Sequence, residues 1–320
     1  MATRLSVTTS LETPLSVELD LRRQRGLWSD AWRRLLKNRL AMVGLVMLVV
    51  VAAVAFLAPH VHWIGHYAPG EQHFEAGDKQ ASPSWKYWFG TDQLGRDMWA
   101  RTLEGLRISL QIGVGTQVLV LAIGVLVGAS AALGGRLTDN ILMRLTDVTY
   151  AFPDLLFIIL IRAALTGSPD NPRDLPIVTN QKMVIIIAIA MVNWTTIARL
   201  VRGQMLSLAE RDYVLAARAL GASRWRIVMQ HMLPNTLGPV IVAITFGIPV
   251  AIFAEAALSF IGFGVPPPAA SLGTLVKSGY DFIQRNVWNV VFPAGAIALL
   301  MLCFTFLGDG LRDALDPRTR

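Results

Sequence analysis

The sequence has only one cysteine, Cys303, and it is poor in charged residues. A single cysteine excludes a disulfide within the chain and a zinc site built from cysteines. Charged residues make up 16% of the chain, whereas a soluble domain carries about 25%. Because 53% of the residues are hydrophobic, this shortage of charge indicates a membrane protein.

The sequence also lacks the nucleotide-binding motif G-x-x-x-x-G-K-[ST], whose lysine and hydroxyl hold phosphates and magnesium. The nearest stretch is "FGTDQLGRD", in which Gly90 and Gly95 have the spacing of the two glycines. Arg96 and Asp97 then stand where the motif has Lys and Ser/Thr. The glycine spacing is therefore a false positive for a phosphate loop, and no ATPase site is expected in this chain.

Catalytic and metal-binding arrangements are missing as well. No Ser/His/Asp set or pair of carboxylates recurs in a pattern that indicates catalysis. Four of the five histidines gather in one segment, and they are His60, His62, His66 and His73. Imidazoles at such spacing are able to share an ion, but interface polarity explains them better. The sequence predicts neither an enzyme nor a metal site.

Long apolar runs, by contrast, are abundant. A bilayer core about 30 Å thick needs roughly 20 apolar residues in a helix, and five uncharged windows approach or exceed that length. They are Leu40–Ala58, Ile108–Leu133, Met183–Ala198, Thr236–Ala254 and Asn286–Gly308. A weaker sixth run, residues 147–165, contains "LLFIILI" together with Asp154 and Arg162. The pattern predicts an all-α polytopic membrane protein with six transmembrane helices.

The basic residues are distributed unevenly between the two faces of this layout. With the N-terminus inside, nineteen Lys and Arg fall on the inner side and nine on the outer side, as the positive-inside rule requires. The first apolar run is too deep in the chain and too long for a cleaved signal peptide, so we expect an uncleaved anchor. The net charge of +7 therefore reflects topology rather than nucleic-acid binding, and both termini are expected in the cytoplasm.

The most informative inner segment is "SLAERDYVLAARALGASRWRIVMQHMLPN", residues 207–235. Ser207 and Glu210 form a capping-box pattern, which predicts that a helix starts there. Gly221 favours the end of that helix, Ser223 favours the start of a second one, and Pro234 is expected to end the second. The segment is predicted to be a helix, a tight turn and another helix.

Two functions are compatible with that shape. A helix, a Gly-containing turn and a basic second helix also describe a DNA-binding helix-turn-helix. This segment lies between two predicted membrane spans, however, and no third helix completes a soluble core. A docking element on the cytoplasmic face is therefore the favoured interpretation.

The same segment resembles the "EAA" loop of ABC-importer permeases, written E-A-A-x3-G-x9-I-x-L-P. When the two are aligned on Gly221, the alanines of the motif fall on Ala216 and Ala217, and its final pair falls on Leu233 and Pro234.

Three further stretches resemble the dipeptide/oligopeptide/nickel branch of that family. "FGTDQLGRDMWAR" is similar to its G-T-D-x-x-G-R-D segment, and "AEAALSFIGFGVPPP" to the stretch that closes its fifth span. "DAWRRLLKNRLAMVGL" resembles the N-terminal region of its C-type, DppC/OppC-like subunit. The chain departs from the family in having Leu215 for the motif's glutamate, His231 for its isoleucine, and Leu272-Gly273 for a Trp-Gly pair that many members have.

The resemblance implies the type I ABC importer permease fold and a division of labour among subunits. With a second, homologous permease, the chain would form the pathway for di- or oligopeptides across a bacterial or archaeal inner membrane. Two cytoplasmic ATPase subunits would bind ATP and magnesium, and an extracytoplasmic binding protein would deliver substrate. The alternatives are a permease for nickel or another small solute, a stand-alone secondary transporter and, least favoured, an intramembrane enzyme.

The resemblance also implies a division of the chain. Residues 1–26 would form a flexible cytoplasmic tail, and residues 27–107 a basic helix, the first transmembrane helix and an extracytoplasmic loop. Residues 108–320 would form the permease core, with a cytoplasmic coupling loop at 201–235. The loop residues expected to turn the chain or contact the ATPase are Glu210, Tyr213, Ala216, Ala217, Gly221, Ala222, Leu233 and Pro234.

Charged residues within the predicted spans are costly and usually face a cavity or a partner. Glu255, Asp154 and Arg162 are therefore candidates for the peptide pathway. Interfacial snorkelling or a bond to a neighbouring helix is favoured for Asp154 and Arg162, and both interpretations stay open for Glu255.

The "FGTDQLGRD" stretch is expected on the outer face, ahead of the second span. Gly90, Asp92, Gly95, Arg96 and Asp97 would form a tight turn there. An internal Asp–Arg pair that fixes the turn is one interpretation, and contact with the docked binding protein is the other. Further along, Gly124 and Gly128 form a G-x-x-x-G pair, which permits close helix packing.

Overall fold

The computed structural model describes residues 27–316 except 76, 169–170 and 173–179, so the expected tail at 1–26 lies outside the described residues. The described chain is predominantly helical, as the sequence predicts. The strands within it are β1 (Gly167–Ser168) and β2 (Asn171–Pro172), which pair antiparallel over two residues each.

Five segments of the described chain are long and apolar enough to cross a membrane. They are α2 (Arg39–Leu57), α4 (Met98–Leu133), α7 (Gln181–Ala209), the continuous segment Arg224–Phe260, and α12 (Trp288–Leu315). The fourth of these consists of α9 (Arg224–Ile227), the π-helical turn η1 (Val228–Met232) and α10 (Leu233–Phe260). Shorter helices are α1 (Leu27–Lys37), α3 (His62–Gly65), α8 (Asp212–Ala219) and α11 (Leu272–Tyr280).

The predicted third span, residues 147–165, is not one continuous helix. It is divided between α5 (Gly135–Ala151) and α6 (Asp154–Thr166), which are bent by 100° relative to each other. Phe152 has extended backbone angles because the ring of Pro153 disfavours a helical residue before it. A sixth span exists only if this bent pair is counted as one.

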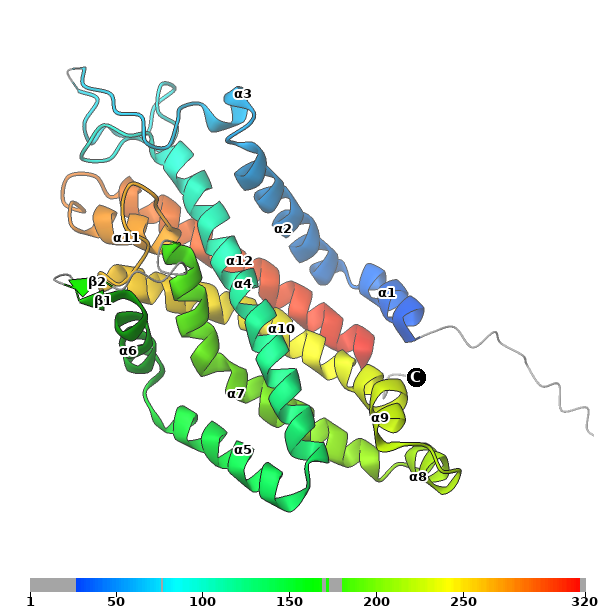
Figure 1. Ribbon diagram of the computed structural model, residues 1–320. Coiled ribbons are helices and arrows are strands. Elements are labelled where there is room, and N and C mark those ends of the chain that lie inside the picture. The colour runs from blue at the N-terminus through cyan, green and yellow to red at the C-terminus, as the bar shows by residue number, and fades with distance from the viewer. Residues whose placement is uncertain (1–26, 76, 169–170, 173–179, 317–320) are drawn as a thin grey trace, which may run out of the picture.

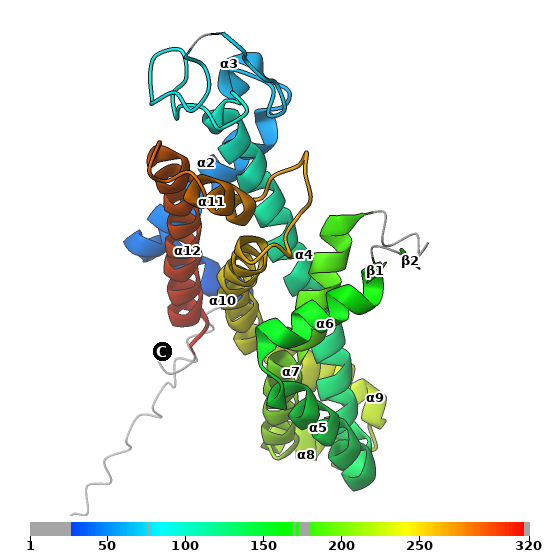
Figure 2. The ribbon, with the colours of Figure 1, turned by 90° about the vertical axis from the view of Figure 1, so that its left-hand side faces the viewer.

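The spanning helices form two groups joined by α4 and α10. Figure 2 shows α2, α11 and α12 on one side and α5, α6 and α7 on the other, with α4 and α10 between them. α4 and α7 run parallel along a seam of glycines. A Cβ on Gly124 would lie 2.6 Å from the Cβ of Ile197, and one on Gly128 would contact the carbonyl oxygen of Ala198. The G-x-x-x-G pair thus lies where the two backbones approach most closely.

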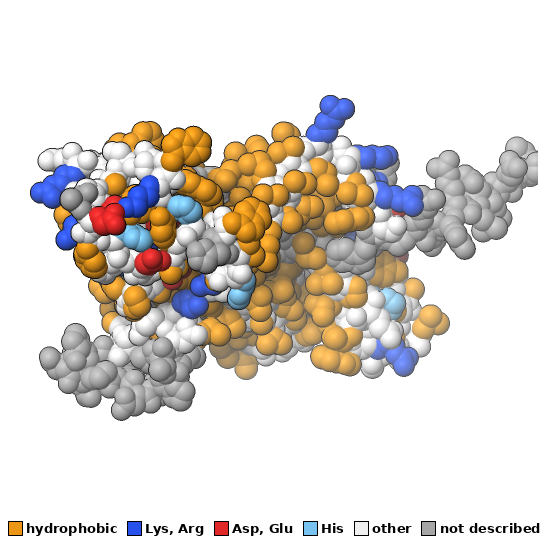
Figure 3. All heavy atoms as spheres, turned by 90° about the horizontal axis from the view of Figure 1, so that it is seen from above, with side chains coloured by type: hydrophobic (Ala, Val, Ile, Leu, Met, Phe, Trp, Pro, Cys, Tyr) orange, Lys and Arg blue, Asp and Glu red, His pale blue; other side chains and the backbone are white. Residues whose placement is uncertain are grey.

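The two ends of the bundle differ. α1 packs on the last turns of α12 through Ala31, Leu35 and Ala314, so the first and last described segments lie side by side (Figure 1). α3, the long segment before α4, and α11 lie at the opposite end (Figure 1). Figure 3 shows charged side chains gathered at both ends and a broad apolar surface between them, as a membrane-spanning bundle requires.

Candidate functional site: the coupling segment and the extracytoplasmic turn

The coupling segment, residues 210–235, begins later than the capping-box pattern predicts. α7 continues through Ser207 to Ala209, and α8 starts at Asp212 after the extended Arg211. The helix start expected at Ser207 is therefore wrong. The physical reason is packing: Val201 and Met205 are fully buried in the core shared with α8 and α10, and this burial extends α7 past the local capping signal.

The turn after α8 is a Schellman motif centred on Gly221. Gly221 has φ +80°, its N–H donates to the carbonyl oxygen of Arg218 at 3.0 Å, and the N–H of Ala222 donates to that of Ala217 at 3.1 Å. This pair of bonds satisfies carbonyls that the end of a helix leaves free. A left-handed backbone explains why glycine occupies this position.

The next helix starts at Ser223, as expected, and its hydroxyl accepts a hydrogen bond from the N–H of Arg226 at 3.3 Å. Pro234, however, does not end it. The helix passes through the π-helical turn η1 into α10, and Pro234 lies in the first turn of α10. The proline lacks the N–H for the regular helical hydrogen bond, and it follows directly on the π-helical turn, where the regular bonding pattern is already interrupted. The second helix of the coupling segment is therefore continuous with a membrane span.

One face of the coupling segment is attached to the bundle. Val214 of α8 is completely buried, and it lies in one apolar cluster with Met205 of α7, Ile227 of α9 and Met232 of η1. Ala217, Ala222 and Leu233 pack against the same cluster. Burial of a valine side chain contributes about 1.5–3 kcal/mol, which holds α8 against the helices it joins.

The opposite face exposes large apolar side chains, here called the exposed tip: Tyr213, Leu215, Leu220, Trp225 and Met229. Leu220 is 88% exposed and Trp225 is 70% exposed, which is unusual for such residues in water. Glu210 and Ala216 are exposed as well. The sequence pattern did not single out Leu220 or Trp225. These two residues lie on either side of the Gly221 turn among arginines, and this position is the signal from which their exposure could have been predicted.

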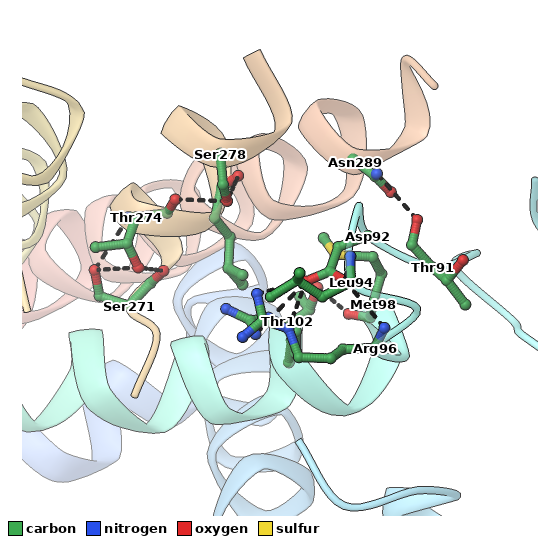
Figure 4. A network of polar contacts seen from close by, with 12 residues as sticks. Thr91, Asp92, Leu94, Arg96, Met98, Thr102, Ser271, Thr274, Ser278 and Asn289 are labelled. Atoms are coloured by element: carbon green, nitrogen blue, oxygen red, sulfur yellow. Dashed lines mark hydrogen bonds and ion pairs between the residues drawn. The ribbon is translucent and has the colours of Figure 1, made fainter. Parts of the chain in front are cut away.

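The turn expected on the outer face, residues 90–97 and named the extracytoplasmic turn after that expectation, is organised by the carboxylate of Asp92 (Figure 4). Its Oδ1 accepts hydrogen bonds from the N–H groups of Leu94 at 2.8 Å and Arg96 at 3.0 Å. Its Oδ2 lies 2.7 Å from Nη2 of Arg96 and 3.6 Å from Nη1 of Arg101. The expected Asp–Arg pair is thus present and internal, and Arg101 of α4 also faces it.

The two glycines of this turn have left-handed backbones, with φ +78° at Gly90 and +72° at Gly95. A Cβ on Gly90 would collide with the carbonyl oxygen of Ala81, and one on Gly95 with that of His73. The spacing that imitates a phosphate loop therefore arises because another part of the extracytoplasmic segment crosses closely over both positions.

Asp97 caps α4, since its Oδ2 accepts a hydrogen bond from the N–H of Ala100 at 3.0 Å. Its side chain is completely buried, and this burial raises the pKa of the carboxyl above its ordinary value despite that hydrogen bond. Asn289 of α12 donates to the carbonyl oxygen of Thr91 at 3.1 Å and so connects the turn to α12 (Figure 4).

The side chains of Asp92 and Asp97 are therefore engaged inside the protein. The most exposed large apolar side chains in this region are Trp63, Phe74 and Trp85, with Trp85 96% exposed. Nearby, burial acts to raise the pKa of Asp78, but its hydrogen bonds and the positive charge of Lys86, whose Nζ lies 3.1 Å away, together outweigh burial and leave that pKa below its ordinary value.

Two histidines of this segment, His66 and His73, are packed among aromatic rings. His66 stacks on Trp88 with ring centroids 5.1 Å apart, and His73 contacts Tyr67 edge-on at 4.6 Å. Among the described residues, no group of three or more His, Cys, Asp or Glu is close enough to hold a metal ion.

The three intramembrane charges have different surroundings. Asp154 is exposed at the start of α6. Arg162 donates from Nη2 to the carbonyl oxygen of Gly264 at 3.0 Å and lies 5.8 Å from the ring centroid of Phe263. Glu255 is completely buried and bonds to serines. The structure shows no shared binding site formed by these three residues.

This architecture defines a multi-pass helical membrane protein, and comparison with known proteins identifies its class. Residues 124–320 match the family "Binding-protein-dependent transport system inner membrane component", and residues 26–83 match "N-terminal TM domain of oligopeptide transport permease C". The chain belongs to the first family, whose model covers more than half of it.

Two curated relatives narrow the resemblance to the OppC/DppC kind of permease. The chain is 43% identical to the "Oligopeptide transport system permease protein OppC" of Bacillus subtilis (strain 168), over 92% of this chain and 90% of that protein. It is 40% identical to the "Dipeptide transport system permease protein DppC" of the same organism, over 91% of this chain and 86% of that one.

A solved structure confirms the fold. A chain of the MetNI methionine ABC transporter matches with a TM-score of 0.53 and 18% identity, over 66% of this chain and 94% of that chain. The protein is therefore a permease subunit of an ABC importer, with the type I permease fold.

Proposed function

We propose that this chain, together with a second homologous permease, forms the pathway of an ATP-driven importer of di- and oligopeptides in a bacterial or archaeal inner membrane. The observation that carries the proposal is the 43% identity to OppC along 92% of the chain. Both termini are placed in the cytoplasm in this proposal, in line with the excess of Lys and Arg on that side.

The coupling segment docks on cytoplasmic ATPase subunits, which bind and hydrolyse ATP with magnesium. Its exposed tip supplies apolar contacts, and its buried face joins α7 and α10. Because α9 continues into α10, a displacement of the tip when the ATPase subunits close is passed directly to a membrane span. Two further residues shape the coupling segment: Gly221 turns the chain after α8, and Ala217 allows α8 to pack closely against the bundle.

At the other end, an extracytoplasmic binding protein delivers the peptide. The exposed Trp63, Phe74 and Trp85 offer apolar contact area to such a partner, whereas the turn at Asp92 shapes the surface from within. Residues 27–107 thus provide the contact with the binding protein, and residues 108–320 form the permease core around the pathway.

The test is uptake in a bacterial strain without its own peptide permeases, supplied with this gene and the neighbouring transporter genes. Labelled peptides of two to five residues are expected to accumulate, and deletion of this gene or inactivation of the ATPase subunit is expected to abolish the accumulation. Radioactive nickel is offered in parallel. Accumulation of nickel without peptide uptake would refute the proposed substrate class.

A further inference from the structure

Glu255 is a completely buried acid at the point where α4, α10 and α11 meet. None of the described Lys or Arg residues forms an ion pair with it, and every hydrogen bond that its carboxylate accepts comes from a serine. A buried carboxylate costs several kcal/mol unless its surroundings satisfy it. The role of Glu255 therefore depends on the hydroxyl groups that donate hydrogen bonds to its carboxylate.

The first donor is controlled by a backbone group of α11. The N–H of Leu272 donates to Ser109 Oγ at 3.3 Å, and a backbone N–H can only donate. Ser109 therefore accepts there and gives its own hydroxyl proton to Glu255 Oε2, at 3.1 Å.

The second donor is controlled in the same way. The N–H of Thr274 donates to Ser271 Oγ at 3.3 Å, and the Ser271 and Ser259 hydroxyl oxygens are 3.2 Å apart. Ser259 gives its proton to Glu255 Oε1 at 2.6 Å, so Ser271 is the donor toward Ser259; Thr274 Oγ1, at 3.5 Å, is a second, longer acceptor for the Ser271 hydroxyl. Both carboxylate oxygens thus act as acceptors, at the ends of two chains that start at the first turn of α11.

Close packing reinforces this connection. A Cβ on Gly273 would lie 2.5 Å from Cα of Ala256 on α10, and one on Gly105 of α4 would lie 3.0 Å from the backbone nitrogen of Leu272. The first turn of α11 is therefore in backbone contact with both neighbouring helices. A Cβ on Gly279, near its other end, would collide with the carbonyl oxygen of Asn289 on α12.

These contacts form a continuous path from one end of the protein to the other. α10 is continuous with the coupling segment, Glu255 connects α10 to α11, and Asn289 connects the neighbouring α12 to the extracytoplasmic turn. Figure 4 shows Ser271, Thr274 and Ser278 of the α11 region and, on the far side of the Asp92 group, the Thr91–Asn289 contact.

We propose that Glu255 is a positioning residue that locks α11 to α10 and α4, so that a displacement of α10 during the transport cycle also moves α11 and the extracytoplasmic surface. Glu255 thereby couples events at the two faces of the membrane and does not bind the peptide. The role in transport rests on the proposed function, but the lock itself is a property of the chain.

Glu255→Gln tests the lock because glutamine keeps the volume and replaces one accepting oxygen with a donating NH2 group. Spin labels at Phe253 on α10 and Tyr280 on α11, both exposed, report the distance between these helices after Cys303→Ala removes the natural cysteine. The measurement uses the complete transporter in nanodiscs. We expect one narrow distribution of the distance between the two labels when Glu255 is present, and a broadened distribution in Glu255→Gln.

Transport provides the second readout. Glu255→Gln is expected to lower peptide uptake at least tenfold while ATP hydrolysis continues, because the ATPase contacts lie at the other end. Ser109→Ala, which interrupts one chain only, is expected to give an intermediate broadening should Glu255→Gln fail to assemble. Ser278→Ala is the matched control on α11, since its hydroxyl bonds only to carbonyls of its own helix, at 2.9 and 3.1 Å.

An unchanged narrow distribution in both Glu255→Gln and Ser109→Ala would overturn the lock. Narrow distances with lost peptide uptake would likewise overturn it and assign Glu255 to the pathway. If the unchanged transporter carries no peptide at all, the proposed function fails, while the distance measurement still decides the lock.

Discussion

The turn at Gly221 allows the backbone cost of a substitution to be separated from side-chain contacts. Gly221 has φ +80°, and a Cβ added to it would meet nothing within 4 Å. An alanine there therefore introduces no clash, and its cost is that of a left-handed backbone, about 1–2 kcal/mol. Asparagine tolerates this conformation better, and β-branched valine tolerates it least.

This reasoning predicts a graded series at Gly221, in which Asn is the mildest change, Ala is intermediate and Val is the most severe. A cost of about 1.4 kcal/mol shifts the equilibrium between the closed and opened turn about tenfold. Hydrogen exchange of the Ala222 amide, which is bonded in the Schellman motif, should accelerate in that order. Coupling of ATP hydrolysis to uptake should weaken in the same order. Gly221→Asp should abolish it although its backbone cost is as small as that of Asn, because it adds a negative charge at the proposed docking surface.

Gly203→Ala is the matched control, because Gly203 lies inside α7 with nothing within 4 Å of an added Cβ. Alanine is favoured over glycine inside a helix by roughly 0.5–1 kcal/mol, so this variant should be neutral or stabilised. Equal effects of Asn, Ala and Val at Gly221, in exchange and in coupling, would refute the backbone explanation.

Two further variants test the packing and the extracytoplasmic turn. Asp92→Ala should lower the free energy of unfolding by about 3–5 kcal/mol, because it leaves Arg96 and Arg101 without their buried partner. Thermal unfolding of the purified subunit measures this loss. An unchanged transition temperature would contradict it. Gly128→Leu should separate α4 from α7 and prevent assembly, whereas Gly203→Leu should not. Normal amounts of assembled Gly128→Leu protein in the membrane would argue against close packing of α4 on α7.

Local signals were sufficient where the structure depends on neighbouring residues. The caps at Gly221 and Ser223 formed as predicted because a left-handed glycine and a capping hydroxyl act within a few residues of themselves. The apolar windows located the spans for a similar reason, since crossing a bilayer depends on the length of an apolar run.

The same local signals failed where distant contacts compete with them. The capping pattern at Ser207 was overridden by the burial of Met205. α4 begins at Met98, ten residues before the uncharged window, because Asp97 caps it there and Asp92 pairs with Arg101 of its first turn. Pro153 lies inside the apolar run at 147–165, and the apolar run predicts one span where the proline divides the chain into α5 and α6.

The sequence by itself determined that the chain is a multi-pass helical membrane protein, where most of its spans lie and how the coupling segment turns, because these features depend on apolar length and local backbone preference. Only the tertiary structure decided that α7 and α8 meet after Ala209, that Leu220 and Trp225 are exposed, and that Asp92 is internal. The same holds for the partners of Glu255, because Ser109 is 146 residues away along the chain and no local rule relates residues that only folding brings together.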